Sequence, residues 1–297
     1  MSDHSRPVLQ IIAPEPTSDG AGVRLLRVLG GQAMDRLDPF LLLDHFGSDD
    51  PNDYMAGFPM HPHRGIETVT YMLRGRVRHR DSLGNEGVIE SGDVQWMTAA
   101  GGILHEEMPE HGEGGLAGFQ LWVNLPARSK RNPPRYRNLS AEKIPLVENG
   151  SGATIRVVAG RIGKVRGPVD DVEADPTYLD VTLDAGATFR YPVPDEHNAF
   201  TYLFRGSARF GGEEISASRL VVFGDRRGGA IGGGEGAVAG GSEGDVVAEA
   251  GAQGARFLLV AGAPLGEPVA RYGPIVMNTR AEVMEALRDL EQGTFVR

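Results

Sequence analysis

Two pairs of potential metal ligands stand out in the first half of the chain. His61 and His63 are separated by one residue, and His105 and Glu107 show the same spacing further along. Because side chains alternate along a β-strand, each pair points to one face of its strand, and Glu67 shares the parity of the first pair if that strand is regular. Two such strands facing each other would bring three imidazoles and a carboxylate together.

This set of side chains suits a redox-active first-row metal ion such as Fe(II). Imidazole and carboxylate are the usual ligand mixture of that ion, and a four-ligand site leaves two octahedral positions open. The chain has no cysteine, which excludes thiolate zinc sites, disulfides and a cysteine nucleophile. We therefore expect one Fe(II) ion, although other divalent first-row ions are compatible with these ligands. The remaining histidines lack such a partner and are expected to be structural or surface residues: His4, His45, His79, His111 and His197.

The sequence around these pairs predicts short antiparallel strands. Runs of β-branched and aromatic residues alternate with Gly, Pro, Asn and Asp, as in Glu67–Leu73, Arg76–Asp81 and Val94–Thr98. The second half repeats this pattern, and only the end is plainly helical, where Thr279 and Glu282 form a capping box. We expect an all-β chain of jelly-roll barrels with a short C-terminal helix.

An internal repeat divides the chain into two modules. Thr70–Gly75 reads TYMLRG and Thr201–Gly206 reads TYLFRG, an offset of 131 residues. We expect an N-terminal metal-binding domain over residues 1–135 and a C-terminal domain over residues 136–297. The same offset places Pro192, Pro194 and Asn198 opposite His61, His63 and Glu67, and the counterparts of His105 and Glu107 near Ala237. The second module therefore lacks the ligands, and one metal per chain is predicted.

Composition limits the partners of the chain. Its 297 residues carry 30 Lys and Arg against 40 Asp and Glu, a net charge of −10, which disfavours binding to nucleic acid or to an anionic membrane. The opening residues, MSDHSRPVLQ, lack the apolar core of a signal peptide, and no early apolar run is long enough to span a bilayer. We expect a cytoplasmic protein, and a monomer, because the second barrel could cover the exposed sheet of the first.

Several segments together resemble the pirin family of the cupin superfamily. The first module alone resembles a cupin, and the segments that carry the family resemblance span nearly the whole chain: DPFLLLDHFG (38–47), GFPMHPHRGIETVTYMLRG (57–75), SGDVQWMTAAGGILHEEMP (91–109), GFQLWVNLP (118–126) and RYGPIVMNTRAEV (271–283). The resemblance implies two tandem cupin domains with one mononuclear iron in the N-terminal barrel. A generic cupin would use Glu67 as the carboxylate ligand, whereas the pirin pattern implies the set His61, His63, His105 and Glu107.

The resemblance also implies two functions of different classes. One is a metal-dependent dioxygenase that opens the heterocycle of the flavonol quercetin at positions 2 and 3 and releases carbon monoxide. The alternative is a non-catalytic, iron-dependent regulatory protein that binds a protein partner, such as a transcription factor or a metabolic enzyme. In the enzyme, Glu67 is the candidate general base if Glu107 is the ligand.

The C-terminal segment carries a concentration of apolar side chains. Tyr272, Ile275, Val276 and Met277 precede a helix that has an apolar stripe of its own. So much apolar surface is unfavourable in water, and we expect the segment to pack back across the N-terminal barrel.

Overall fold

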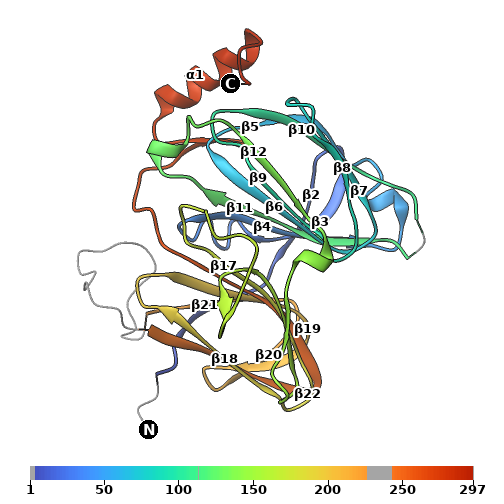
Figure 1. Ribbon diagram of the computed structural model, residues 1–297, viewed down its shortest axis with the longest axis vertical. Coiled ribbons are helices and arrows are strands. Elements are labelled where there is room, and N and C mark those ends of the chain that lie inside the picture. The colour runs from blue at the N-terminus through green and yellow to red at the C-terminus, as the bar shows by residue number, and fades with distance from the viewer. Residues whose placement is uncertain (1–3, 113, 226–242, 297) are drawn as a thin grey trace. The chain divides into compact units, whose positions relative to one another are not determined.

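The computed structural model describes residues 4–112, 114–225 and 243–296, and it is an all-β chain with one short C-terminal helix (Figure 1). The predicted fold class is confirmed. The chain folds into two compact units. We call the unit formed by Glu15–Gly31, Phe40–Glu142 and Glu267–Arg297 the N-terminal barrel, and the unit formed by Met1–Pro14, Gln32–Pro39 and Lys143–Gly266 the C-terminal barrel.

Each end of the chain belongs to the barrel that is formed mainly by the other half of the sequence. Strand β1 (Val8–Ile12) pairs with β21 (Arg219–Phe223) and so belongs to the C-terminal barrel, whereas the last residues of the chain belong to the N-terminal barrel. The strand with which a terminal strand pairs decides to which barrel it belongs. Its position in the sequence alone does not predict this. The division into residues 1–135 and 136–297 stays a prediction about the extent of each repeat.

Two antiparallel sheets form the N-terminal barrel. The larger sheet has the order β12-β9-β6-β11-β4-β3-β2. Its strands are β2 (Glu15–Asp19), β3 (Val23–Leu29), β4 (Phe40–Ser48), β6 (Ile66–Arg74), β9 (Val94–Thr98), β11 (Leu116–Asn124) and β12 (Arg135–Leu139). The smaller sheet has the order β5-β10-β7-β8, with β5 (Phe58–His63), β7 (Val77–Asp81), β8 (Glu86–Ile89) and β10 (Ile103–Pro109). Short 3₁₀ helices lie in the connections at Pro51–Asp53, Ala127–Ser129 and Ala141–Lys143.

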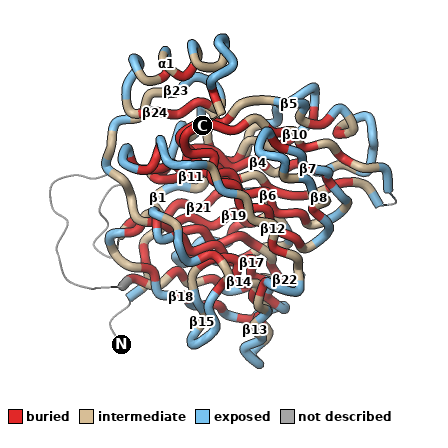
Figure 2. The backbone as a smooth tube through the Cα atoms, turned by 45° about the horizontal axis from the view of Figure 1, so that its top comes forward, coloured by how far each residue is buried: buried red, intermediate tan, exposed pale blue. Residues whose placement is uncertain are grey.

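The interior of the N-terminal barrel is built from both sheets. One apolar cluster draws Phe46 and Met72 from the larger sheet and Val77 from the smaller one. The two-residue period of the strands decides which side chains enter this interior. On β7, Val77, His79 and Asp81 are buried while the arginines between them are exposed. Figure 2 shows buried residues along the central strands of the fold.

The C-terminal barrel is a single nine-stranded sheet that encloses a continuous apolar core. Its order is β1-β21-β19-β22-β17-β14-β13, with β18 also paired to β22 and β20 to β19. The remaining strands are β13 (Leu146–Glu148), β14 (Ala153–Ala159), β17 (Thr177–Leu183), β18 (Thr188–Pro194), β19 (Asn198–Phe210), β20 (Glu213–Ser216) and β22 (Glu243–Gly262), and β15 (Arg161–Ile162) pairs separately with β16 (Val165–Arg166).

The C-terminal segment packs against the N-terminal barrel, as predicted. It contains β23 (Ala270–Tyr272), β24 (Ile275–Met277) and α1 (Arg280–Glu291), which begins with the expected capping box. Ile275, Met277 and Val283 form an apolar cluster onto which Leu104 of β10 packs. The backbone of Arg64 exchanges hydrogen bonds with this segment, accepting one from Val276 and donating one to Pro274.

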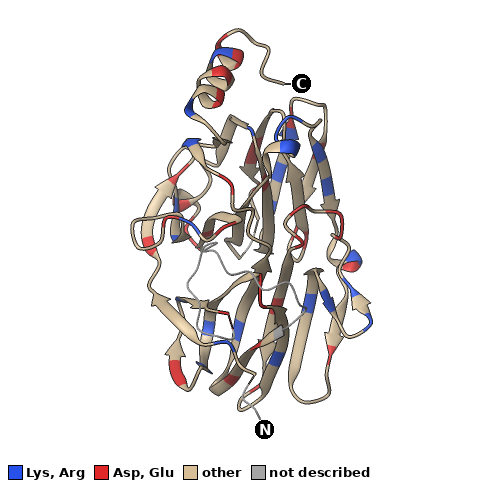
Figure 3. Cartoon of the chain, turned by 90° about the vertical axis from the view of Figure 1, so that its left-hand side faces the viewer, with Lys and Arg blue, Asp and Glu red and all other residues tan. Residues whose placement is uncertain are grey.

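Charged residues of both signs are interspersed along the strands (Figure 3). The helix α1 has 12 residues. Across residues 4–112, 114–225 and 243–296, no helix is long and apolar enough to cross a membrane.

Candidate metal centre

Three of the predicted ligands come together inside the N-terminal barrel. His61 and His63 lie on β5, and His105 lies on the neighbouring strand β10, directly opposite His61 in the antiparallel register. The Nε2 atom of His61 lies 3.0 Å from the Nε2 atoms of both His63 and His105. Among the described residues, these three form the group whose ligand atoms are close enough together to hold a metal ion.

The hydrogen bonding of His61 indicates that this cluster fits a cation. Its Nδ1 lies 2.9 Å from the carbonyl oxygen of Pro59, which can only accept, so Nδ1 carries the proton and Nε2 presents a lone pair. The single lone pair on Nε2 of His61 cannot accept linear hydrogen bonds from both His63 and His105. A cation, in contrast, can be bound by the Nε2 lone pairs of all three rings. The 3.0 Å separations also match two ligands at about 2.1 Å from an ion and at a right angle to each other.

Burial keeps two of the imidazoles neutral. His63 and His105 are almost completely inaccessible to solvent. Burial lowers the pKa of each ring well below the ordinary value of 6.5, and neighbouring histidines add to the shift. A metal ion binds the unprotonated nitrogen, so these rings are ready to act as ligands at neutral pH.

Glu107 faces the same interior as His105 but stands apart from the closely spaced nitrogens. It lies two residues further along β10 and is buried. Thr70 donates a hydrogen bond of 2.7 Å to one carboxylate oxygen, and Gln120 donates one of 2.8 Å to the other. These two donors, both from the larger sheet, hold the carboxylate in the interior of the barrel.

The turn between β5 and β6 separates Glu67 from the histidines. Gly65 has a φ of +80°, and a Cβ at this position would collide with the backbone oxygen of Val276. The chain leaves the smaller sheet at this turn and enters the larger one. The expectation that Glu67 shares a face with His61 and His63 assumed one regular strand, and the turn removes that shared face.

Glu67 points away from the barrel interior. Thr70, which contacts Glu107, follows three residues later on a regularly paired strand, and an odd separation puts two side chains on opposite faces. The Glu67 carboxylate accepts a hydrogen bond of 2.6 Å from Thr98, and burial raises its pKa. The structure therefore brings Glu107, and not Glu67, into the interior with the histidines.

Two buried residues next to the site, His79 and Asp81, were not predicted from the sequence. His79, which we expected to be structural or on the surface, has its Nδ1 atom 3.5 Å from Nδ1 of His105. Its Nε2 atom lies 3.3 Å from a carboxylate oxygen of Asp81. The alternation in VRHRD, residues 77–81, with arginines on every second position, is the signal that places His79 and Asp81 inside.

The interior beside Glu107 holds little free space. A cavity of about 10 Å³, lined by Phe58, Thr70, Glu107 and Gln120 among others, has room for roughly one water molecule. His61 is partly exposed, in contrast to His63 and His105. His61 is therefore the member of the cluster that is open to solvent.

Among its described residues, the C-terminal barrel has no counterpart of the histidine cluster. Its inward-facing residues on β18 are Tyr191 and Val193, which belong to the apolar core. Pro192 and Pro194, which the repeat offset places opposite His61 and His63, lie on the other face of the strand. The counterparts of His105 and Glu107 near Ala237 lie outside the described residues. In the part of the chain that is described, no second group of potential metal ligands occurs.

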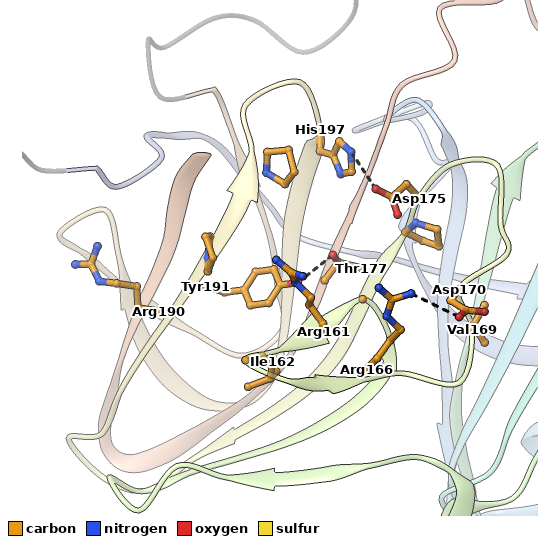
Figure 4. Close-up of a pocket in the computed structure, with 15 residues that line it drawn as sticks. Arg161, Ile162, Arg166, Val169, Asp170, Asp175, Thr177, Arg190, Tyr191 and His197 are labelled. Atoms are coloured by element: carbon orange, nitrogen blue, oxygen red, sulfur yellow. Dashed lines mark hydrogen bonds and ion pairs between the residues drawn. The ribbon is translucent and has the colours of Figure 1, made fainter. Parts of the chain in front are cut away.

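A polar cavity of about 540 Å³ lies in the C-terminal barrel (Figure 4). Its side chains pair with one another: Arg166 with Asp170 at 3.7 Å, His197 with Asp175 at 3.9 Å, and Tyr191 with Thr177 at 3.3 Å. Burial lowers the pKa of His197, so the ring is neutral at neutral pH. Nδ1 of His197 has no hydrogen-bond partner among the described residues.

Comparisons with known proteins agree with this architecture. Residues 22–123 match the Pirin family, and residues 178–234 and 228–296 match the Pirin C-terminal cupin domain. The chain is 47% identical over 295 residues to a Pseudomonas aeruginosa protein named "Putative quercetin 2,3-dioxygenase", with 97% of each chain covered. It is 45% identical over 291 residues to a pirin-like protein of Caulobacter vibrioides, with 98% of this chain and 99% of the relative covered.

A solved structure shows the same fold over almost the full length. The crystal structure of quercetin 2,3-dioxygenase from Acinetobacter baumannii is 32% identical in sequence, with a TM-score of 0.84 and 98% of each chain covered. The two family matches and the identity of the full-length relatives lead to one conclusion: the chain belongs to the pirin family and is built from two cupin domains.

Proposed function

We propose that this chain is a metal-dependent dioxygenase that opens flavonols such as quercetin between positions 2 and 3, with carbon monoxide as a second product. The convergence of three imidazole rings on one point, two of them kept neutral by burial, is the observation that carries the proposal. The names of the Pseudomonas relative and of the Acinetobacter structure support the flavonol as the substrate.

His61, His63, His105 and Glu107 are the proposed ligands of a single Fe(II) ion. Each oxygen of the Glu107 carboxylate accepts one protein hydrogen bond and keeps a further lone pair for a metal. When bound, the ion supplies a Lewis acid for the 3-hydroxyl group of the flavonol and a redox partner for oxygen. Three neutral rings and one carboxylate leave the site with a net positive charge, which favours an anionic flavonolate.

The residues around the cluster orient the substrate and limit water. The interior beside Glu107 admits about one water molecule, so the flavonol rings stay outside it. The substrate presents its 3-oxygen edge at the partly exposed His61, while the buried rings of His63 and His105 close the inner side. Trp122, whose ring stands edge-on to His63 at 5.2 Å, shields this inner side with apolar surface.

Turnover by the metal-loaded chain tests the proposal. The protein is purified without oxygen, loaded with Fe(II) and mixed with quercetin in air-saturated buffer. We expect oxygen uptake, loss of the flavonol absorbance and release of carbon monoxide, all above the level of free iron. His61→Ala should abolish all three signals.

A matched control is His45→Ala, which removes a partly buried histidine that lies outside the cluster, with its ring centre 4.7 Å from that of Phe119. This variant should keep its turnover. If fully metallated protein neither bleaches nor releases gas with several flavonols, the enzyme proposal fails, and the iron-dependent regulatory protein becomes the better hypothesis.

A further inference from the structure

We propose that His79 and Asp81 are positioning residues that fix the proton of His105, so that its Nε2 lone pair is available to a metal. This inference rests on the metal-dependent function proposed above. It concerns the row of side chains Asp81, His79 and His105, in which only His105 belongs to the metal cluster. The inference assigns a role to the other two buried residues.

Strand pairing places these side chains in one row. On the antiparallel pair β7 and β10, Asp81 lies opposite His105 and His79 lies opposite Glu107, so all four side chains share the inward face. The side chains of His79 and Asp81 are completely buried, and His105 is completely buried as well. Water therefore cannot replace any partner in this row.

The row begins at a carboxylate that can only accept hydrogen bonds. One oxygen of Asp81 accepts from the backbone nitrogens of Leu83 and Asn85, at 2.9 and 3.0 Å. The other oxygen accepts from the Asn85 side chain at 2.8 Å. The turn after β7 thus holds Asp81 rigidly, and the 3.3 Å contact with Nε2 of His79 requires the proton on that nitrogen.

The proton positions of the two histidines follow from this starting point. A neutral imidazole that donates from Nε2 can only accept at Nδ1. In the neutral form of His79, the 3.5 Å contact between the Nδ1 atoms of His79 and His105 is therefore donated by His105. With its proton on Nδ1, His105 presents a lone pair at Nε2, the atom that lies 3.0 Å from Nε2 of His61.

Packing keeps the middle ring of this row in place. The His79 ring stacks on Tyr136, with 4.8 Å between ring centres and 25° between the planes. A histidine held by a carboxylate on one side and an aromatic ring on its face has little freedom to turn. Residues in such outer positions contribute roughly 10- to 100-fold to metal affinity in other metalloproteins.

Cobalt(II) titration of the full chain under nitrogen tests this role. The visible absorption of bound Co(II) reports both affinity and ligand geometry. His79→Phe keeps the aromatic stack on Tyr136 but removes the acceptor, and we expect a 10- to 100-fold weaker cobalt affinity and an altered spectrum. His79→Asn places an amide oxygen near the position of Nδ1 and should restore most of the affinity.

Asp81→Asn provides an independent test of the proton positions. Its remaining oxygen can still accept from the turn, but its amide donates to His79 and reverses the proton order along the row. We expect weaker cobalt binding, together with a lower melting temperature because the new amide nitrogen cannot accept the hydrogen bond from the Asn85 side chain. The double variant His79→Phe/Asp81→Asn should bind no more weakly than His79→Phe alone, because Asp81 acts through His79.

The outcomes separate this inference from the proposed function. His45→Phe, at a partly buried histidine outside the row, is the matched control and should bind cobalt like the unchanged protein. If His79→Phe and Asp81→Asn both bind as tightly as the unchanged protein, the inference is overturned and the metal site stands. If the unchanged protein binds no cobalt, both fail together. Should His79→Phe not fold, the result for Asp81→Asn decides.

Discussion

Two buried glutamates near the histidines face opposite sides of the larger sheet, and each is suited to a different role. Glu107 is held in the barrel interior by Thr70 and Gln120, whereas Glu67 is bound to Thr98 on the other face. We predict that Glu107→Gln weakens Fe(II) affinity by roughly tenfold or more, because an amide is a poorer ligand than a carboxylate. Competition with a coloured chelator measures this affinity. Glu67→Gln is the matched control and should leave it unchanged, and the opposite result would favour the generic cupin ligand.

Glu67 should instead affect the stability of the fold. Burial raises its pKa in the folded state above the ordinary value of 4.5, so the folded protein holds this proton more tightly than the unfolded chain does. The carboxyl group therefore favours folding below about pH 4.5 and costs stability as the pH rises through the raised pKa. We predict that Glu67→Gln is at least as stable as the unchanged protein at pH 7 and loses this advantage at pH 4.5. Urea unfolding at both pH values measures the difference.

At the scale of elements, Lys130 joins three parts of the N-terminal barrel. Its buried ammonium group donates hydrogen bonds to the Gly65 carbonyl at 2.7 Å, to the Asn124 side chain at 2.6 Å and to the Val276 carbonyl at 3.1 Å. Lys130→Met leaves these buried acceptors without a donor, and each such loss costs about 1–3 kcal/mol. We predict a loss of about 3 kcal/mol or more in the free energy of unfolding, measured with urea.

The neighbouring Arg131 offers a matched control for that variant. It forms a two-pronged ion pair with Glu285 of α1 at 2.9 Å, but its side chain is 46% exposed. Exposed ion pairs contribute about 1 kcal/mol or less. Arg131→Met should therefore lower the free energy of unfolding far less than Lys130→Met does. Equal losses in the two variants would show that contact with the C-terminal segment, rather than the buried hydrogen-bond donor, accounts for the destabilisation.

The elements also show what the sequence could and could not predict. Alternation of apolar and polar residues predicts most strands and the shared face of His61 and His63, because the two-residue period is a local property. The separation of Glu67 from these residues depends on the turn at Gly65, where the chain changes sheets in response to packing by distant residues. The contact of His79 with His105 depends on strand register, which no single segment encodes.

At the scale of the whole chain, the two barrels share a sequence repeat but differ in the polar contacts of their interiors. Both barrels keep a threonine of the TYMLRG and TYLFRG repeats in a buried position, Thr70 and Thr201. Thr70 contacts the carboxylate of Glu107, whereas the hydroxyl of Thr201 has no hydrogen-bond partner among the described residues. The described interior of the C-terminal barrel is filled with apolar side chains, whose burial stabilises the fold.

This asymmetry predicts one metal ion per chain. Protein loaded with excess Fe(II) without oxygen and then freed of loose metal should contain one equivalent by elemental analysis. His63→Ala should reduce this value to near zero, since it removes one of three converging nitrogens. The matched control is His197→Ala, which removes the buried histidine of the C-terminal barrel, whose Nε2 atom lies 3.9 Å from the Asp175 carboxylate. This variant should retain one equivalent. A content of two equivalents that falls to one in His197→Ala would place a second metal in the C-terminal barrel and contradict the loss of its ligands.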